Sequence, residues 1–289
     1  FSSRIRVIYN ESYLNLKATR IILILCFSVF ALNAISQGIY FSGSRSNSLA
    51  NASVCLEDVY AYHNNPANLS FIKNVSVGLS YENRFLLKEL QNQSLAIAIP
   101  LKYGVLSIGG NTFGHQNFRT FKSGLGYAML LTKDLSMGIQ MNHQMIRLNE
   151  AYGVNQTVTG ELGLSYSVNR DWSIGMSVFN IGRNKLTSSP EDRYSTTMRL
   201  GTKYQLSEKT MLLAEFEKDI EHDLRSKIGI EYLPVKSIAF RGGFATSPIE
   251  LSFGLGWLIS EKYTLDFGTQ FHQLLGWSPH ISFKYVFAK

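Results

Sequence analysis

Charged residues, proline and cysteine are all scarce in this chain of 289 residues. Charged side chains make up 17%, against roughly 25% in average soluble domains, and there are six prolines and two cysteines. Two cysteines are too few for a disulfide-stapled miniprotein, and 45% hydrophobic residues exclude a disordered chain. A mean hydropathy of −0.02 leaves no room for several apolar membrane helices. A helical membrane protein with many spans is therefore also excluded.

Signatures of catalysis and metal binding are missing as well. The chain has no Gly-x-Ser-x-Gly, phosphate-binding loop or dinucleotide-binding fingerprint. Cys55 is interpreted as a small buried apolar residue. The six histidines lack the spacing of metal ligands; they are His63, His115, His143, His222, His272 and His280. The sequence therefore predicts no enzyme, no metal site and no cofactor.

The formal charge of +7 is concentrated at the start of the chain. Residues 1–36 hold four basic residues and one acidic residue. Removing them from the totals of 28 and 21 leaves 24 basic and 20 acidic residues, a net charge of +4. No basic cluster remains that would indicate nucleic-acid binding.

Residues 1–36 have the features of a signal peptide. Two basic residues precede an apolar run of fourteen residues, 21–34, and small residues follow. The run is too short to cross a hydrocarbon core about 30 Å thick as a helix. We therefore expect export, with residue 37 as the mature N-terminus; a buried N-terminal helix is the alternative. Residues 1–15 are alternatively interpreted as translated from sequence upstream of the true start, because no methionine precedes Met129.

Strict period-two alternation dominates the chain from residue 74 onward. Over residues 135–142, for example, Leu, Met, Ile and Met alternate with Ser, Gly, Gln and Asn. This period predicts β-strands with one apolar face. Short polar turns and breaks divide the region into fourteen expected strands. They lie near residues 74–86, 91–99, 103–114, 119–131, 135–148, 155–168, 172–182, 193–206, 210–218, 223–233, 237–245, 250–259, 263–273 and 279–288.

The even number and length of these strands favour an all-β transmembrane antiparallel barrel over 74–289, with a soluble β-sandwich as the alternative. A tilted membrane strand needs about 9–11 residues, longer than the average soluble strand. Phe283, Tyr285 and Phe287 alternate up to the end of the chain. This pattern is similar to the aromatic terminal strand that the outer-membrane insertion machinery recognises. With both mature termini in the periplasm, five aromatics are expected at the two membrane interfaces: Trp172, Trp257, Trp277, Tyr204 and Tyr263.

The segment before the barrel, residues 37–73, breaks the alternation and carries a family resemblance. A run of small residues at 43–52 is followed by the acidic pair Glu57-Asp58, a short aromatic stretch and Asn65-Pro66-Ala67. This order resembles the N-terminal region of the long-chain fatty-acid transporter (FadL-like) superfamily, and more closely its PorV/PorQ branch in Bacteroidota. Two departures are Asn68, where the family usually has glycine, and a small-residue run with less glycine.

The resemblance implies that residues 37–73 fold into the barrel as a lumenal hatch or plug. A barrel of this size has a lumen too wide for its own side chains to fill. We expect Asn65-Pro66-Ala67 to end a short helix and to redirect the chain into the first strand. The alternative is a periplasmic tail that merely precedes the barrel.

Opposite charges are expected to face one another inside the barrel. Counting back from the turns pairs Arg199 with Glu217, Glu217 with Arg225 and Glu215 with Lys227, and puts Arg241 one strand further on. Such cross-strand pairs stabilise a sheet. This lumenal charge ladder is interpreted either as a structural network or as a binding or gating site.

Three functions are compatible with this sequence. The PorV/PorQ resemblance implies a non-enzymatic outer-membrane scaffold, anchor or substrate-handling component of type IX protein secretion, with translocon or surface-attachment proteins as partners. The wider superfamily implies transport of a hydrophobic small molecule, which would need an apolar lumenal pocket and a strand kink, at Gly109-Gly110 or Gly242-Gly243. The third is an accessory barrel of another outer-membrane assembly.

Overall fold

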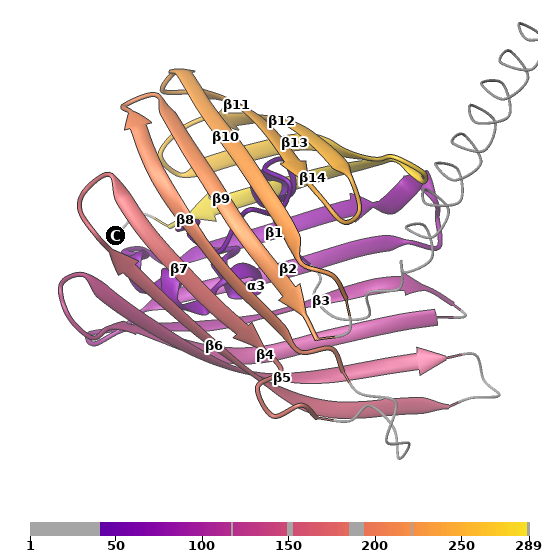
Figure 1. The fold of residues 1–289 in the computed structure, drawn as a ribbon. Coiled ribbons are helices and arrows are strands. Elements are labelled where there is room, and N and C mark those ends of the chain that lie inside the picture. The colour runs from indigo at the N-terminus through magenta and orange to yellow at the C-terminus, as the bar shows by residue number, and fades with distance from the viewer. Residues whose placement is uncertain (1–40, 117, 149–152, 185–193, 221, 288–289) are drawn as a thin grey trace, which may run out of the picture. The chain divides into compact units, whose positions relative to one another are not determined.

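The computed structural model describes residues 41–116, 118–148, 153–184, 194–220 and 222–287, which all belong to one compact unit, Gln37–Lys289. Fourteen antiparallel strands form a closed barrel in which each strand pairs with its sequence neighbours and β1 pairs with β14 (Figure 1). The predicted fold class and strand number are thus confirmed. The predicted signal peptide lies outside the described residues.

The strands are eight to fourteen residues long. Their bounds are Ser76–Asn83 (β1), Gln91–Pro100 (β2), Val105–His115 (β3), Phe118–Leu130 (β4), Leu135–Leu148 (β5), Val154–Ser167 (β6), Trp172–Phe179 (β7), Thr197–Ser207 (β8), Thr210–Asp219 (β9), Arg225–Val235 (β10), Ile238–Ala245 (β11), Glu250–Leu258 (β12), Tyr263–His272 (β13) and Gly276–Val286 (β14). A 3₁₀ helix, η2 (Arg84–Leu86), lies between β1 and β2.

The two ends of the barrel differ. At one end, the terminal end, β1 begins, β14 ends and the connections are short turns. The other end, the loop end, carries the connections that follow β1, β3, β5, β7, β9, β11 and β13. The connection between β13 and β14 is shorter than expected, because β14 begins at Gly276 and includes Pro279 opposite Thr269. Proline removes only one ladder donor, so it does not have to end a strand.

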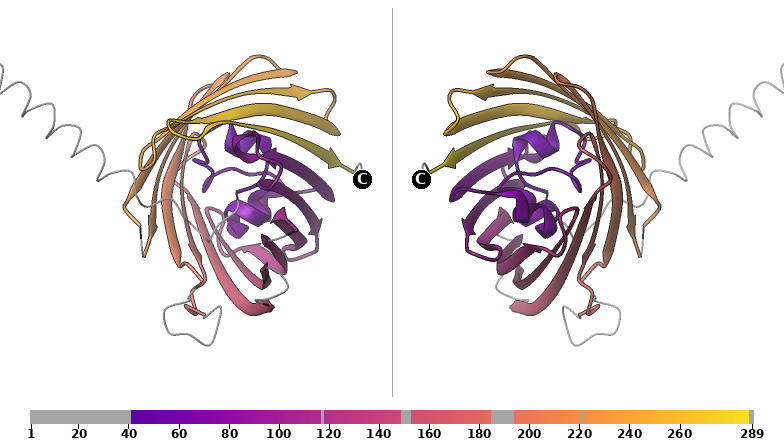
Figure 2. Two further views of the ribbon diagram at one scale, coloured as in Figure 1. Left: turned by 90° about the vertical axis from the view of Figure 1, so that its right-hand side faces the viewer. Right: turned by 90° about the vertical axis from the view of Figure 1, so that its left-hand side faces the viewer.

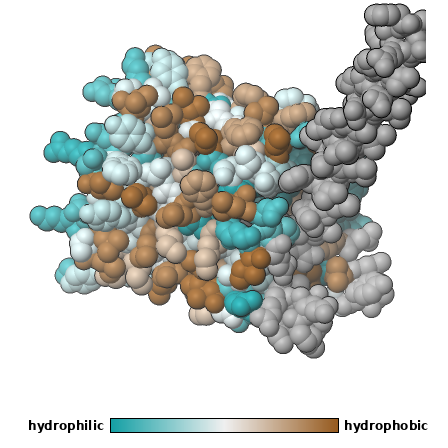
Figure 3. Space-filling view, viewed as in Figure 1, coloured by the Kyte–Doolittle hydropathy of each residue, from teal (hydrophilic) through white to brown (hydrophobic). Residues whose placement is uncertain are grey.

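The apolar face of each strand points outward. Leu79 in β1 and Met141 in β5 are 52% and 65% exposed, whereas Ser136 and Asn142 in β5 are buried. A soluble sandwich would bury its apolar face instead. Hydrophobic side chains cover the middle of the wall, and hydrophilic ones gather along the edge formed by the turns (Figure 3). This pattern is the one that a lipid-facing barrel requires.

No ladder break occurs at the two glycine pairs that were candidates for a kink. Gly109 and Gly110 in β3 pair in continuous register with β2 and β4, and Gly242 and Gly243 pair in the same way with β10 and β12. Gly243 has a different role: a Cβ at this position would lie 2.4 Å from the backbone nitrogen of Ala50 inside the barrel. The glycine is therefore needed for close packing.

The described part of the chain before β1, from residue 41 onward, lies inside the ring of strands (Figure 2). It contains the short helices α2 (Ser44–Asn47) and α3 (Ala61–Asn64) and the 3₁₀ helix η1 (Pro66–Phe71). We call residues 41–74 the hatch; the boundary at residue 37 lies outside the described residues. Side chains of the hatch form two apolar clusters with the wall, one against β2 to β4 and one against β9. None of the described helices is long and apolar enough to cross a membrane.

Candidate functional site in the barrel lumen

The acidic pair of the hatch is held by two different cations. Glu57 is half-exposed and forms an ion pair with Lys203 of β8. Asp58 is buried, accepts a hydrogen bond from the backbone N–H of Tyr60 at 2.9 Å, and lies 3.4 Å from the guanidinium of Arg45. The first contact ties the hatch to the wall, and the second ties one part of the hatch to another.

Asn65 joins three parts of the hatch and wall. Its amide nitrogen donates to the carbonyls of Val54 and Leu164, at 2.7 and 3.2 Å, and its oxygen accepts from the N–H of Ala67 at 3.2 Å. Helix α3 ends here, as expected, but Pro66 then begins η1 instead of directing the chain into β1. Proline is favoured at the first position of a helix, because its missing N–H is not needed there.

Glu215 of β9 is the centre of a buried ion cluster. Arg199 donates to both of its carboxylate oxygens, at 2.8 and 3.0 Å, and Lys227 of β10 donates at 3.0 Å. One of these oxygens also accepts the backbone N–H groups of Ser53 and Val54, both at 2.8 Å. The wall carboxylate therefore holds the hatch main chain directly.

The two cations of this cluster also reach the hatch. Arg199 donates to the hydroxyl of Ser53 at 2.9 Å and to the carbonyl of Asn64, and Lys227 donates to the carbonyl of Asn51 at 3.3 Å. Both cations lie over the ring of Phe41, at 4.7 and 4.3 Å from its centroid. Buried charges are tolerated only when they are paired and hydrogen-bonded, so the hatch completes the environment that these charges need.

The backbone register agrees with the predicted charge ladder, and it also places Lys227 opposite Glu215. Glu217 lies opposite Arg199 and Arg225, as the turn count indicates, and accepts from Lys227 at 2.7 Å. The guanidinium of Arg225, however, forms its ion pair with Glu250 of β12. A long side chain can reach the next strand, and backbone register does not fix that choice.

Arg241 belongs to a second cluster that the turn count did not reveal. Its guanidinium donates to Glu231 at 2.6 Å and to Asp266 at 2.7 Å. Arg45 of α2 completes the cluster with bonds of 2.8 and 2.6 Å to the two carboxylate oxygens of Glu231. Glu231 lies directly opposite Arg241 in the hairpin, so extending the count through that turn would have found this pair. Nothing in the sequence indicated Arg45.

A third part of the lumen lies in β3 to β7 and combines a cation with aromatic rings. The ammonium of Lys122 lies 3.3 Å from Glu161, and 6.0 and 5.3 Å from the ring centroids of Tyr62 and Phe179. Phe179 packs edge-on against Tyr194, with centroids 5.7 Å apart. We call these residues, with Phe113 and Ile146, the aromatic sector. All seven residues are buried. Tyr62 of α3 is the member that the hatch contributes.

Polar groups without a partner adjoin this sector. Among the described residues, Asn111 Oδ1 and Thr120 Oγ1 are buried and accept no hydrogen bond. Asn111 lies opposite Lys122 in the ladder, and Thr120 lies opposite Phe113. Buried polar atoms normally have a partner, so this part of the lumen has unused capacity for polar contacts beside an apolar wall.

Several hatch side chains have perturbed pKa values, His63 and Cys55 among them. Burial, with the charge of Lys122 as a second cause, lowers the pKa of His63 to about 3. Its Nε2 lies 3.2 Å from the carbonyl of Leu95, and its Nδ1 has no described partner. Burial raises the pKa of the Cys55 thiol to about 12. Cys55 is free and packs in an apolar cluster, so the geometry gives no sign of thiol reactivity.

The predicted interface aromatics lie near the strand ends and are all exposed on the wall. Trp172 and Tyr204 face one another at the terminal end of β7 and β8, and Trp257 and Tyr263 lie near the same end. Trp277 lies at the loop end of β14. Their role at a membrane interface remains a prediction.

The terminal aromatics Phe283, Tyr285 and Phe287 follow the closing seam of the barrel. Phe283 lies opposite Leu79, and the carbonyls of both residues lie 2.8 Å from the hydroxyl of Tyr60. The N–H of Phe287 donates to the carbonyl of Val75 at 2.9 Å. The hatch thus contacts the seam, while the insertion signal itself remains a prediction. Within the described ranges, no group of side chains could hold a metal ion.

The closed fourteen-stranded barrel with a hatch in its lumen has the fold of FadL-like outer-membrane barrels. Three solved structures share the fold. The Ralstonia pickettii toluene transporter TbuX has a TM-score of 0.64 and 14% identity over 88% of this chain and 99% of its own. The P. putida toluene transporter TodX has 0.65 and 13%, over 88% and 100%. A Pseudomonas aeruginosa FadL homologue has 0.60 and 10%, over 88% and 100%.

A family model identifies the protein more narrowly. The match covers residues 66–229, more than half of the chain, and the chain belongs to the family described as "Putative MetA-pathway of phenol degradation". No curated protein matches the chain in sequence. The fold is that of the toluene transporters and the FadL homologue, and these similarities do not single out the PorV/PorQ branch.

Proposed function

We propose that the protein lets a small hydrophobic molecule enter the barrel lumen of an outer membrane, without catalysing a reaction. The observation that carries this proposal is the aromatic sector, in which buried aromatic rings and Ile146 surround the ion pair of Lys122 and Glu161 inside a closed barrel. Two barrels of the same fold are described as toluene transporters, and the family description also refers to an aromatic compound. Ligand sites of this kind are mostly apolar with a few placed polar groups.

Passage through the barrel requires the hatch to move. The hatch fills the lumen against β2 to β4 and β9 and is held there by the clusters around Glu215 and Glu231. A ligand that packs against Phe179 would lie beside Tyr62 of the hatch, since Lys122 contacts both rings. Ligand binding and hatch position are therefore coupled in this proposal.

The test is equilibrium binding of toluene to the purified full chain in detergent, measured by calorimetry. We expect Phe179→Ala to weaken binding by about 10-fold, because removal of one buried aromatic wall costs roughly 1–2 kcal/mol. Phe240→Ala is the matched control: Phe240 is an aromatic residue on the outer face of β11, 51% exposed. Equal affinity of all three proteins, or no saturable binding by the parent, would refute a lumenal site.

A second candidate is the scaffold, anchor or substrate-handling role in type IX protein secretion. The unbroken ladders of β3 favour it, because release of a ligand through the wall would need a strand kink. The close packing of the hatch against the wall also favours a barrel through which no molecule passes. On this hypothesis, the partners are translocon or surface-attachment proteins, and the chain is exported by its predicted signal peptide.

Purification in mild detergent with mass spectrometry separates the two candidates. Co-purification of type IX translocon, sortase or cargo C-terminal domains would support the secretion role. Recovery of a different assembly would instead support an accessory barrel. A lone barrel that binds toluene saturably would leave transport as the better explanation.

A further inference from the structure

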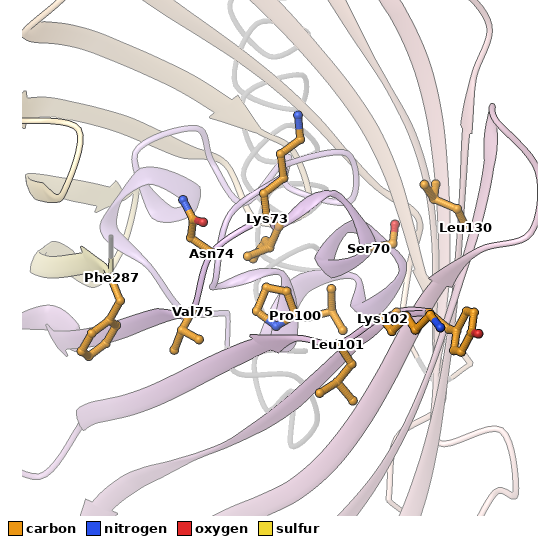
Figure 4. Close-up of a pocket in the computed structure, with 13 residues that line it drawn as sticks. Ser70, Lys73, Asn74, Val75, Pro100, Leu101, Lys102, Leu130 and Phe287 are labelled. Atoms are coloured by element: carbon orange, nitrogen blue, oxygen red, sulfur yellow. The ribbon is translucent and has the colours of Figure 1, made fainter. Parts of the chain in front are cut away.

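A groove of about 770 Å³ opens at the terminal end of the barrel, away from the aromatic sector (Figure 4). One side is the last part of the hatch, residues 70–74, with Val75 before β1, and the other is the end of β2 with the following turn, residues 100–104. Val105 of β3, Leu130 of β4 and Phe287 complete the lining. The groove therefore lies where the hatch leaves the lumen and the chain enters the wall.

The charge of the groove is of one sign. Lys73 extends from the hatch and Lys102 from the turn, and their ammonium groups point to different sides (Figure 4). No aspartate or glutamate is among the lining residues. Neither lysine forms an ion pair with a carboxylate of the described residues. Both are exposed, and the ammonium of Lys102 lies 5.1 Å from the ring centroid of Tyr103. The groove thus carries one lysine on each of its two sides and no carboxylate to neutralise them.

The remaining lining is apolar and continues onto the outer wall. Val75, Leu101, Leu130 and Phe287 are between 37% and 52% exposed. Their side chains adjoin the apolar outer faces of β1 and β4, which a bilayer covers in a barrel of this class. A molecule that fits this lining has an anionic head and a hydrocarbon tail.

We propose that the groove binds an anionic phospholipid, with its phosphate near Lys73 and Lys102 and an acyl chain along Leu101 and Phe287. Basic pockets at a membrane surface bind anionic head groups, and each lysine near the surface contributes about fivefold in affinity. The lipid would bridge the end of the hatch and the β2–β3 turn. This site does not depend on what the lumen carries, so it stands apart from both candidate functions.

Native mass spectrometry of the full chain in detergent tests the proposal with added phosphatidylglycerol or phosphatidylcholine. We expect the parent to retain phosphatidylglycerol preferentially. Lys73→Gln with Lys102→Gln should weaken that binding by about 30-fold, the combined effect of two lysines. The matched control is Lys209→Gln with Lys236→Gln, two exposed lysines in other turns at the same end. This control should change the affinity less than twofold.

Two further measurements test the head and the tail separately. Millimolar inorganic phosphate should leave the lipid bound, and displacement by phosphate would mean that the groove is a free-anion site, which overturns the proposal. Leu101→Ser should weaken binding of phosphatidylglycerol but not of glycerol phosphate. Equal losses in the two double-lysine variants would also overturn it, since general surface charge would then explain the preference. Heat-modifiable migration on gels confirms that each variant is a folded barrel.

Discussion

Glu215→Gln should release the hatch while leaving the barrel closed. The substitution keeps the shape of the side chain but removes the charge that faces Arg199 and Lys227 and accepts two hatch N–H groups. Glu217 alone then opposes the two buried cations, at 3.7 and 2.7 Å. Breaking a buried ion pair on one side costs about 3–5 kcal/mol. Most of this free energy should be lost from the seating of the hatch in the lumen, because the main-chain ladders between β8, β9 and β10 remain intact.

Hydrogen exchange followed by mass spectrometry measures this effect on peptides that cover residues 49–56. A loss of 3 kcal/mol corresponds to roughly 100-fold faster exchange of hatch amides, with wall peptides unchanged. Glu250→Gln is the matched control: Glu250 pairs with Arg225 and makes no described contact to the hatch. Adding Lys227→Met to Glu215→Gln restores the charge balance and should recover part of the protection.

Two results would refute this reasoning about the hatch. Exchange of residues 49–56 that rises less than fivefold in Glu215→Gln would mean that apolar packing holds the hatch without the ion cluster. A rise of the same size in Glu250→Gln would mean that loss of any wall ion pair loosens the whole barrel.

Two more predictions concern hatch packing and pH. Gly138→Val should lower the thermal midpoint and expose the hatch to protease, because a Cβ at this position would lie 2.4 Å from the carbonyl carbon of Pro66. The control is Gly160→Val, which should be tolerated because a Cβ there would have no atom within 4 Å. Equal effects of the two variants would contradict the packing argument. His63 is neutral in the folded protein, since its pKa is lowered to about 3, so its stabilising contribution is present above the unfolded pKa of about 6.5 and is lost as the pH falls toward 3. Relative to His63→Gln, the parent should lose about 2 kcal/mol of unfolding free energy between pH 7 and pH 5, as measured by urea midpoints; parallel curves for the two proteins would count against this assignment.

The sequence alone determined the wall of this protein. Period-two alternation and polar turns predicted fourteen strands and the outward apolar face, because these features depend on residues close together in the chain. The pairs of Arg199 with Glu217 and of Glu215 with Lys227 could be predicted for the same reason, since each lies across one short hairpin. The FadL-like resemblance was also visible in the hatch motif.

The tertiary structure alone decided what meets inside the barrel. Arg225 forms its ion pair with Glu250. Arg241 and Arg45 of the hatch both form ion pairs with Glu231. The aromatic sector brings residues of β3 to β7 together with Tyr62 of the hatch and Tyr194. The groove is lined by Lys73 of the hatch and Lys102 of a turn only because the hatch leaves the lumen at that point. These contacts depend on the closure of the barrel and the path of the hatch through it, which no local pattern encodes. Long charged side chains then select among several partners by geometry.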